Sequence, residues 1–153
     1  MTEDSAGPGG VRQFATFLLD GLLFGVDVLT VQEVIRHQAM TRVPCAPPVV
    51  EGLINLRGQI VTAIDMRRRL GLAPAGPGFL AMNVVVRAGD GVISLLVDEI
   101  GDVVEVNPSQ FETPPDTLSP GIRGIVTGIY KLAGRLLLVA DVESVAAVDA
   151  VTD

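Results

Sequence analysis

Residues 51–65 read EGLINLRGQIVTAID, and residues 127–141 read TGIYKLAGRLLLVAD; the two stretches align without a gap. Each has two apolar runs flanking a glycine, which is typical of a β-hairpin with a tight turn. Four positions are identical in the two copies: Gly52 and Gly128, Leu56 and Leu132, Gly58 and Gly134, and Asp65 and Asp141. A repeat of this kind predicts two related structural units.

A weaker similarity precedes each copy. Residues 17–34 and 85–103 both contain an extended run, a glycine turn, a second run and an aspartate. The proline- and glycine-rich segment 73–78 would join the units, which we expect at about 11–80 and 81–148. Pairing of strands from one unit with strands of the other is left open. The expected strands are 13–19, 22–26, 51–56, 59–64, 83–88, 92–97, 125–131 and 135–140.

Both faces of the strand after each turn are apolar. We expect Ile60, Ile64, Leu136 and Leu138 to lie in the core, with Val61, Ala63, Leu137 and Val139 on the opposite face. A small β-barrel fills only its interior with side chains. A second apolar face therefore predicts packing against the twin unit or against a protein partner.

Three short segments have helical signals. Thr30 and Glu33 have the spacing of a capping box, which predicts a helix around the VQEV sequence at 31–34. Residues 66–72 form a second candidate, stopped by Gly71, and residues 142–151 form a third.

Composition restricts the class of protein. The 153 residues include no tryptophan and one cysteine, Cys45, so an intrachain disulfide is excluded and a reducing, cytoplasmic location is expected. No apolar run approaches the roughly 20 residues that span a bilayer. We interpret residues 1–10 as a disordered tail rather than a signal peptide, and residues 149–153 as a C-terminal tail.

The net charge of −7 comes from the second half of the chain. Residues 1–80 have seven acidic and seven basic residues, whereas residues 81–153 have eleven acidic and four basic ones. Such a surface repels phosphate backbones, so nucleic acid is not an expected partner.

Signals for catalysis are missing. His37 is the only histidine, and we interpret it as a solvated surface residue. Asp98 and Glu99 are adjacent, so on an extended chain their side chains point to opposite faces. The sequence has no nucleotide-binding or nucleophile motif, and we expect no enzymatic activity, no cofactor and no metal site.

Arg57 occupies the tip of an otherwise apolar hairpin, Leu56-Arg57-Gly58-Gln59. It could be an ordinary turn residue, but the twin hairpin has Ala133 at the same position. A hairpin of this kind therefore does not require the charge. A guanidinium at this place suits a forked hydrogen bond to a partner's carboxylate or carbonyl groups.

The arginine run that follows the hairpin allows two interpretations. Arg67, Arg68 and Arg69 could form a solvated helix face, or Arg67 or Arg69 could pair with the acidic second half of the chain.

The stretch from Gly52 to Leu72 resembles the signature of the CheW family. It contains the NLRG turn, a strand ending in Ile64-Asp65 and arginines before Leu70. The likeness extends over residues 11–148 as a single CheW-like domain, with the VQEV segment, residues 91–106 and residues 131–145 in the expected order. Thr62 and Met66 depart from the residues that the family often has there, proline and leucine.

This resemblance implies a β-dominated fold of two five-stranded SH3-like barrels with a few short helices. It implies a non-catalytic cytoplasmic adaptor that couples chemoreceptors, at their cytoplasmic tips, to the regulatory domain of a CheA-type histidine kinase. Such an adaptor is recruited to membrane-associated receptor arrays without inserting into the bilayer. The kinase would dock on hydrophobic residues at a barrel end, which the resemblance does not identify.

The resemblance assigns receptor contact to Val31, Glu33, Gly52, Arg57 and Val103, near the groove between the barrels. Two local alternatives compete with this assignment: Glu33 could serve only as a capping residue, and Val31 and Val103 could be ordinary core valines. For the whole chain, the alternatives are an adaptor for surface motility or biofilm formation, and a small ligand-binding barrel or hydrolase.

Overall fold

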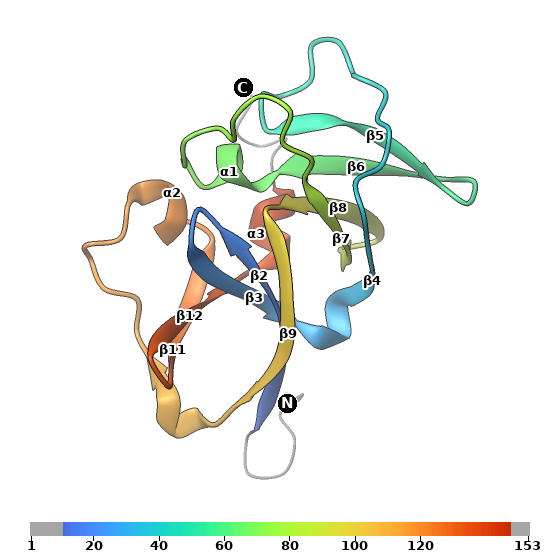
Figure 1. Ribbon diagram of the computed structural model, residues 1–153. Coiled ribbons are helices and arrows are strands. Elements are labelled where there is room, and N and C mark those ends of the chain that lie inside the picture. The colour runs from blue at the N-terminus through green and yellow to red at the C-terminus, as the bar shows by residue number, and fades with distance from the viewer. Residues whose placement is uncertain (1–10, 148–153) are drawn as a thin grey trace.

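A computed structural model describes residues 11–147 (Figure 1). The eight expected strands are confirmed to within one residue at each end. The strands are β2 (Arg12–Leu19), β3 (Leu22–Asp27), β4 (Val31–Ile35), β5 (Val50–Leu56), β6 (Gln59–Asp65), β7 (Met82–Ala88), β8 (Gly91–Val97), β9 (Glu99–Val106), β10 (Phe111–Glu112), β11 (Val126–Leu132) and β12 (Arg135–Ala140). The helices are η2 (Val28–Thr30), α1 (Met66–Arg69), η3 (Pro108–Gln110), α2 (Pro120–Arg123) and α3 (Val142–Ala146).

The strands form two sheets, one above the other in Figure 1. The five-stranded sheet has the order β4-β7-β8-β6-β5, and the six-stranded sheet has the order β10-β11-β12-β3-β2-β9. Neighbours are antiparallel except for β6 with β8 and β12 with β3, which are parallel. This arrangement agrees with the predicted β-dominated fold, with the short strand β10 as a sixth member of one sheet.

The two sheets exchange strands between the sequence repeats. The hairpin β2–β3 from the first repeat lies in the six-stranded sheet, and the hairpin β7–β8 from the second lies in the five-stranded sheet. A boundary near residue 80 therefore does not separate the sheets. The chain crosses between them twice, after Asp27 and at Asp98, the two aspartates that follow the related runs.

The two edges of each sheet are linked, by a bridge in one sheet and by a short connection of the chain in the other. The segment after β4 reaches β5 through a bridge between Thr41 and Leu53, which brings the two edges of the five-stranded sheet together. In the other sheet, β9 at one edge leads through η3 to β10 at the opposite edge. Both sheets therefore curl toward a barrel, as the SH3-like expectation requires.

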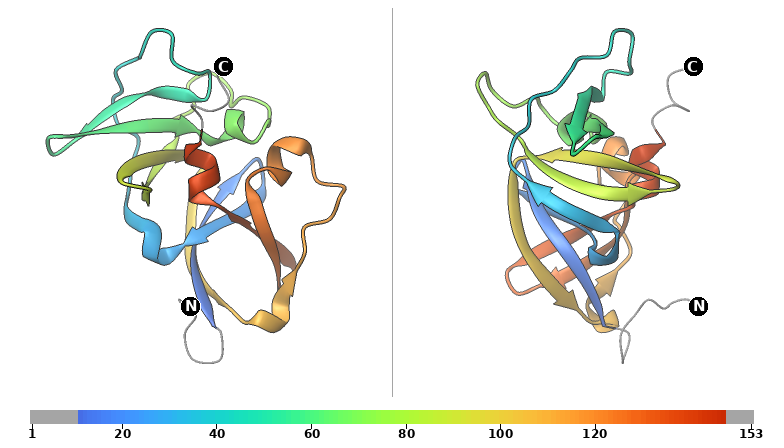
Figure 2. Two further views of the ribbon diagram at one scale, coloured as in Figure 1. Left: turned by 180° about the vertical axis from the view of Figure 1, so that it is seen from behind. Right: turned by 90° about the vertical axis from the view of Figure 1, so that its right-hand side faces the viewer.

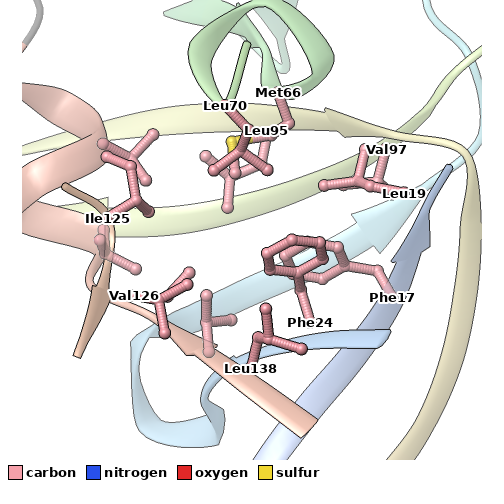
Figure 3. Close-up of a cluster of buried hydrophobic side chains, with 14 of the residues drawn as sticks. Phe17, Leu19, Phe24, Met66, Leu70, Leu95, Val97, Ile125, Val126 and Leu138 are labelled. Atoms are coloured by element: carbon pink, nitrogen blue, oxygen red, sulfur yellow. The ribbon is translucent and has the colours of Figure 1, made fainter. Parts of the chain in front are cut away.

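Buried side chains form one apolar cluster shared by the two sheets and one smaller cluster inside each sheet. The shared cluster lies between the sheets and includes Phe17, Phe24, Leu95 and Val97 (Figure 3). Val61 and Ala63 belong to the inner cluster of the five-stranded sheet. The other apolar face of β6, which includes Ile64, is covered by the twin sheet, as one of the two sequence alternatives proposed.

The core prediction is correct for two residues and wrong for two. Ile64 and Leu138 are buried in the shared cluster, at 2% and 5% exposure. Ile60 and Leu136 are 59% and 47% exposed. Both stand at the start of their strand, next to the hairpin turn. In two views the β5–β6 hairpin extends beyond the rest of the protein, so its tip has no layer to cover it (Figures 1 and 2).

The prediction of a helix at residues 31–34 is wrong. These residues form β4, which pairs with β7 in the register Val31 to Val86 and Val34 to Val84. The short helix ends at Thr30, and its amino end is capped by Asp27, whose carboxylate accepts a hydrogen bond from the Leu29 amide at 2.9 Å. The β-branched residues favour a strand, and tertiary pairing outweighs the capping-box spacing.

The other two helices are confirmed in shortened form. Helix α1 (Met66–Arg69) is capped by Asp65, whose side chain accepts a hydrogen bond from the Arg68 amide. Helix α3 begins after Asp141 and covers the first part of the expected segment 142–151. Of the remainder of that segment, only Ala147 is among the described residues. The two expected tails, residues 1–10 and 149–153, lie outside them.

Candidate partner-binding site

The tip of the β5–β6 hairpin has an unusual backbone at Arg57. Its φ is 50°, and the following Gly58 has a φ of 90°. Two consecutive positive φ values are those of a type I′ turn, which glycine tolerates and arginine does not favour. Asn55 supports the turn by accepting a hydrogen bond from the Gly58 amide at 2.8 Å.

The twin hairpin does not have the same turn. Gly134 has a φ of 81°, but Ala133 lies outside the left-handed region, which among residues 11–147 contains only Asp20, Cys45 and Arg57 apart from glycines. The expectation that Arg57 and Ala133 occupy equivalent turns is therefore wrong. The backbone of Arg57 is held in a conformation that a hairpin of this length can avoid.

The Arg57 side chain forms an ion pair with Glu33, its Nη2 donating to the Glu33 carboxylate. Glu33 lies on β4, and β4 and β5 are the two edge strands of the five-stranded sheet. The Glu33 side chain is 20% exposed, whereas that of Arg57 is 73% exposed. The interpretation of Glu33 as a helix-capping residue is wrong, because its strand has no helix to cap.

Gly52 has a clear packing reason to be glycine. It is buried, and a Cβ atom there would lie 2.7 Å from the carbonyl oxygen of Thr41. That carbonyl accepts a hydrogen bond from the Leu53 amide at 2.8 Å, so the segment that follows β4 is held directly against β5. Gly52 allows this close approach, and its own surface is covered.

Val31 and Val103 lie on the edge strands β4 and β9, one in each sheet. Val31 pairs with Val86 and Val103 pairs with Ala15. Directly opposite residues on antiparallel strands point to the same face. Val86 is in the shared cluster and Ala15 packs against it, so both valines face the layer between the sheets.

The two valines differ in burial. Val31 is half-buried and packs against the shared cluster, so the core interpretation holds in part for it. Val103 is 55% exposed, and the core interpretation is wrong for this residue. At the edge of β9, an exposed valine that faces the seam between the sheets is available to a partner.

The structure thus brings together some of the five expected contact residues. Glu33 and Arg57 are in direct contact, Val31 precedes Glu33 on the same strand, and Gly52 lies on β5 against the backbone of Thr41. Val103 belongs to the other sheet. The pairing of Glu33 with Arg57 has no local sequence signal, since the residues are 24 positions apart.

Arg67 binds a carboxylate of the second half of the chain. Its Nε and Nη2 donate to the two oxygens of Asp98 at 2.9 and 2.6 Å, and its Nη1 donates to the carbonyl of Ala73 at 2.8 Å. The interpretation of this residue as solvated is wrong, and its pairing with the acidic half is confirmed. Arg69 donates to the carbonyls of Ser144 and Val145 at the end of α3.

The pKa of Asp98 reflects this contact. Burial alone would raise the pKa, but hydrogen bonds from Arg67 and from the amide of Asp20, together with the charge of Arg67, lower it below its ordinary value. The pKa of Arg67 is raised, above all by its hydrogen bond to Asp98. Asp98 is the single residue between β8 and β9, so this pair fixes one of the two crossovers between the sheets.

A cavity of about 220 Å³ with a mixed polar and apolar lining adjoins this contact. Its charged and titratable lining is His37, Glu51, Asp65, Arg67, Arg68 and Asp98. Two of these carboxylates are already engaged: Asp65 caps α1, and Asp98 holds Arg67. His37 is exposed and has no hydrogen bond to a carboxylate or a nucleophile among the described residues, so this cavity does not assemble a catalytic pair.

Among residues 11–147, no helix is both long enough and apolar enough to cross a bilayer. The same residues include no cluster of three or more His, Cys, Asp or Glu side chains placed to hold a metal ion.

Comparison with known proteins identifies relatives of this architecture. The model of the CheW-like domain family matches residues 13–149. The chemotaxis protein CheW of Rhizobium meliloti is 30% identical over 136 residues, covering 89% of this chain and 88% of that protein. The chemotaxis protein CheW of Bacillus subtilis is 30% identical over 134 residues, covering 88% of this chain and 86% of the relative.

A solved structure has the same fold. The crystal structure of the scaffolding protein TtCheW from Thermoanaerobacter tengcongensis superposes with a TM-score of 0.80. The match covers 90% of this chain and 94% of that one, with 27% sequence identity.

Proposed function

This chain belongs to the CheW-like domain family and is a non-catalytic chemotaxis scaffold, and from that premise we propose how it couples its partners. One partner is the cytoplasmic tip of a chemoreceptor, and the other is the regulatory domain of a CheA-type histidine kinase. The protein acts in the cytoplasm, where it is recruited to membrane-associated receptor arrays. It needs no cofactor for this function and does not contact nucleic acid.

The receptor tip binds at the Glu33–Arg57 pair. The observation that supports this proposal is the left-handed backbone of Arg57, since strained conformations of this kind cluster at functional sites. The exposed guanidinium can donate further hydrogen bonds to a partner while Glu33 orients it. Val31 and Val103 supply apolar contact along the seam between the sheets.

The kinase regulatory domain binds a separate surface on the six-stranded sheet. A largely apolar cavity of about 330 Å³ lies beside the β2–β3 turn and the start of β12. Leu22 and Leu136 line it and are 37% and 47% exposed. An exposed apolar depression of this kind is typical of a protein-binding surface, and its location on the other sheet leaves the Arg57 site free.

The decisive experiment is a binding titration of the full chain with a receptor-tip fragment, with the kinase regulatory domain, and with both together. We expect a ternary complex. Arg57→Ala should weaken only receptor binding, and Leu136→Asp should weaken only kinase binding. Failure of the wild-type chain to bind either partner would refute the proposed function, and mutual exclusion of the partners would refute the two-surface arrangement.

A further inference from the structure

The loop between β4 and β5, residues 36–49, has a distinctive charge. It contains Arg36, Arg42 and no acidic residue. Both arginines are exposed, and neither forms an ion pair within the described part of the chain. We refer to residues 36–49 as the basic loop. Unpaired guanidiniums at the surface are available to bind a partner.

A buried polar network anchors the first arginine of the basic loop. Asn83 and Ser94 are fully buried, at 0% exposure, on strands whose neighbouring inner residues are apolar. The Ser94 hydroxyl donates to the Asn83 side-chain oxygen at 2.7 Å, and the Asn83 amide nitrogen donates to the carbonyl of Arg36 at 3.0 Å. Buried polar groups are costly unless they are hydrogen-bonded, and here the bond that leaves the core fixes the backbone of Arg36.

A second anchor lies next to Arg42. Thr41 and Leu53 exchange two backbone hydrogen bonds of 2.9 and 2.8 Å, and Gly52 permits that approach. Met40 packs against the inner cluster of the five-stranded sheet. The backbone adjoining each arginine is therefore fixed before any partner arrives, which lowers the entropic cost of binding.

The strand exchange separates charge between the two sheets. Residues 28–97, which contain the five-stranded sheet, carry seven arginines and four acidic residues. Residues 11–27 and 98–147, which contain the six-stranded sheet, carry four basic and ten acidic residues. The basic loop lies in the half of the molecule that has the net positive charge. The net charge of −7 of the whole chain opposes binding to extended polyanions such as nucleic acid or an anionic membrane.

We propose that the basic loop is a docking surface for the Asp and Glu side chains of a protein partner, and that this partner is the receptor tip. This inference rests on the proposed function and extends it to a second cluster of contacts. The choice of partner follows from continuity, since Arg36 comes three residues after Glu33. At about 3.3 Å per residue, Arg36 lies roughly 10 Å along the chain from the Glu33–Arg57 pair.

The test is the kinetics of association of the full chain with the receptor-tip fragment and with the kinase regulatory domain, at low and at moderate salt. We expect Arg36→Glu combined with Arg42→Glu to slow association with the receptor tip about tenfold at low salt and to weaken its salt dependence. Association with the kinase domain should stay unchanged. The neutral pair Arg36→Gln and Arg42→Gln should give an intermediate effect, and it remains informative if the glutamate variant does not fold.

Arg123→Glu combined with Lys131→Glu is the matched control, because it makes the same charge change on the other half of the molecule. Unchanged receptor binding in both double variants of the basic loop, an equal loss in the control, or a loss confined to the kinase domain would each overturn the inference while leaving the proposed function standing. If the wild-type chain bound neither partner, both this inference and the proposed function would be refuted.

Discussion

Arg57 and Glu33 form an ion pair between the two edges of the five-stranded sheet, from the tip of the β5–β6 hairpin to strand β4. The two residues are unequally exposed: the carboxylate is mostly covered and the guanidinium is mostly in solvent. An exposed pair of this kind contributes little to stability, generally less than about 1 kcal/mol. Its main effect is to orient the arginine toward the surface.

The first prediction concerns Arg57→Ala. We expect the free energy of unfolding to change by no more than about 0.5 kcal/mol, as for ordinary surface substitutions. Receptor-tip binding should weaken by about 2–5 kcal/mol, because the substitution removes one side of the charge-assisted contact with the receptor, which becomes desolvated in the complex. Thermal melts and binding titrations measure the two quantities on the same preparation.

Two further variants serve as controls for this prediction. Arg57→Lys should recover only part of the affinity, since an ammonium group cannot reproduce the planar fork. Glu33→Gln should reduce affinity less than Arg57→Ala, because the guanidinium remains present. A large fall in melting temperature for Arg57→Ala would show that the arginine is structural, and normal binding to both partners would show that it is only a turn residue.

A second prediction follows from the backbone of Arg57. Left-handed φ values cost roughly 1 kcal/mol for a residue with a Cβ atom, and glycine avoids this cost. We therefore expect Arg57→Gly to raise the free energy of unfolding by up to about 1 kcal/mol while abolishing the binding contribution of the side chain. Denaturant unfolding should show a rise in the free energy of unfolding, and a binding titration should show a fall in affinity for the receptor tip.

Ala133→Gly is the matched control for Arg57→Gly, because Ala133 does not have a positive φ. There glycine only adds flexibility to the unfolded chain, and we expect a loss of about 0.5–1 kcal/mol. If both glycine variants change stability in the same direction, the strain at Arg57 is not the cause.

The sequence predicted the hairpins well because their signals are local. Alternating β-branched residues and glycine turns were enough to place eight strands, and the gapless repeat indicated twin units. The pattern could not distinguish Ile60 from Ile64. Both are apolar on the same face, and only the projection of the hairpin tip leaves Ile60 exposed.

The candidate site was less accessible to prediction. The VQEV segment has both helical and extended signals, and pairing with β7 decides in favour of a strand. The basic loop depends on contacts with Asn83 and Leu53, which are distant in sequence from Arg36 and Thr41. Such contacts form only when the sheet closes, so no local window of sequence contains them.

A third prediction concerns the pH dependence of stability through Asp98. In the folded state the pKa of Asp98 is below its ordinary value of 3.8. A carboxylate whose pKa is lowered by folding stabilises the folded state at pH values above its ordinary pKa. This contribution is lost as the pH falls below about 4. Asp98→Asn should therefore be less stable than the wild type at neutral pH, by about 1–3 kcal/mol, because Arg67 loses a charged partner.

The measurement is urea unfolding of the wild type and Asp98→Asn from pH 7 down to pH 3. The difference between them should shrink toward the acid end of this range. Asp116→Asn is a suitable control, since the Asp116 side chain is 99% exposed and lies 3.7 Å from Arg123. A difference that stays constant with pH would show that the Arg67–Asp98 pair does not depend on the charge of the carboxylate.

The last prediction compares the twin glycines Gly52 and Gly128. A Cβ at Gly52 would meet the Thr41 carbonyl oxygen at 2.7 Å, and a Cβ at Gly128 would meet the Phe111 ring at 2.3 Å. The Thr41 backbone is held by two hydrogen bonds, whereas the Phe111 side chain is 46% exposed and can rotate away. Gly52→Ala should therefore be more damaging than Gly128→Ala, although its contact is the longer one, because the Thr41 backbone cannot move.

Overpacking at a rigid site typically costs about 1–3 kcal/mol. We expect Gly52→Ala to lie at the upper end of this range and Gly128→Ala to cost less than about 1 kcal/mol. Hydrogen exchange should locate the damage, with the amides of Thr41 and Leu53 exchanging faster in Gly52→Ala because their bridge is forced apart. Receptor binding should fall in the same variant, since the basic loop loses one anchor. If binding falls while those two amides remain protected, Gly52 acts at the partner surface itself and the supporting role assigned to it is wrong.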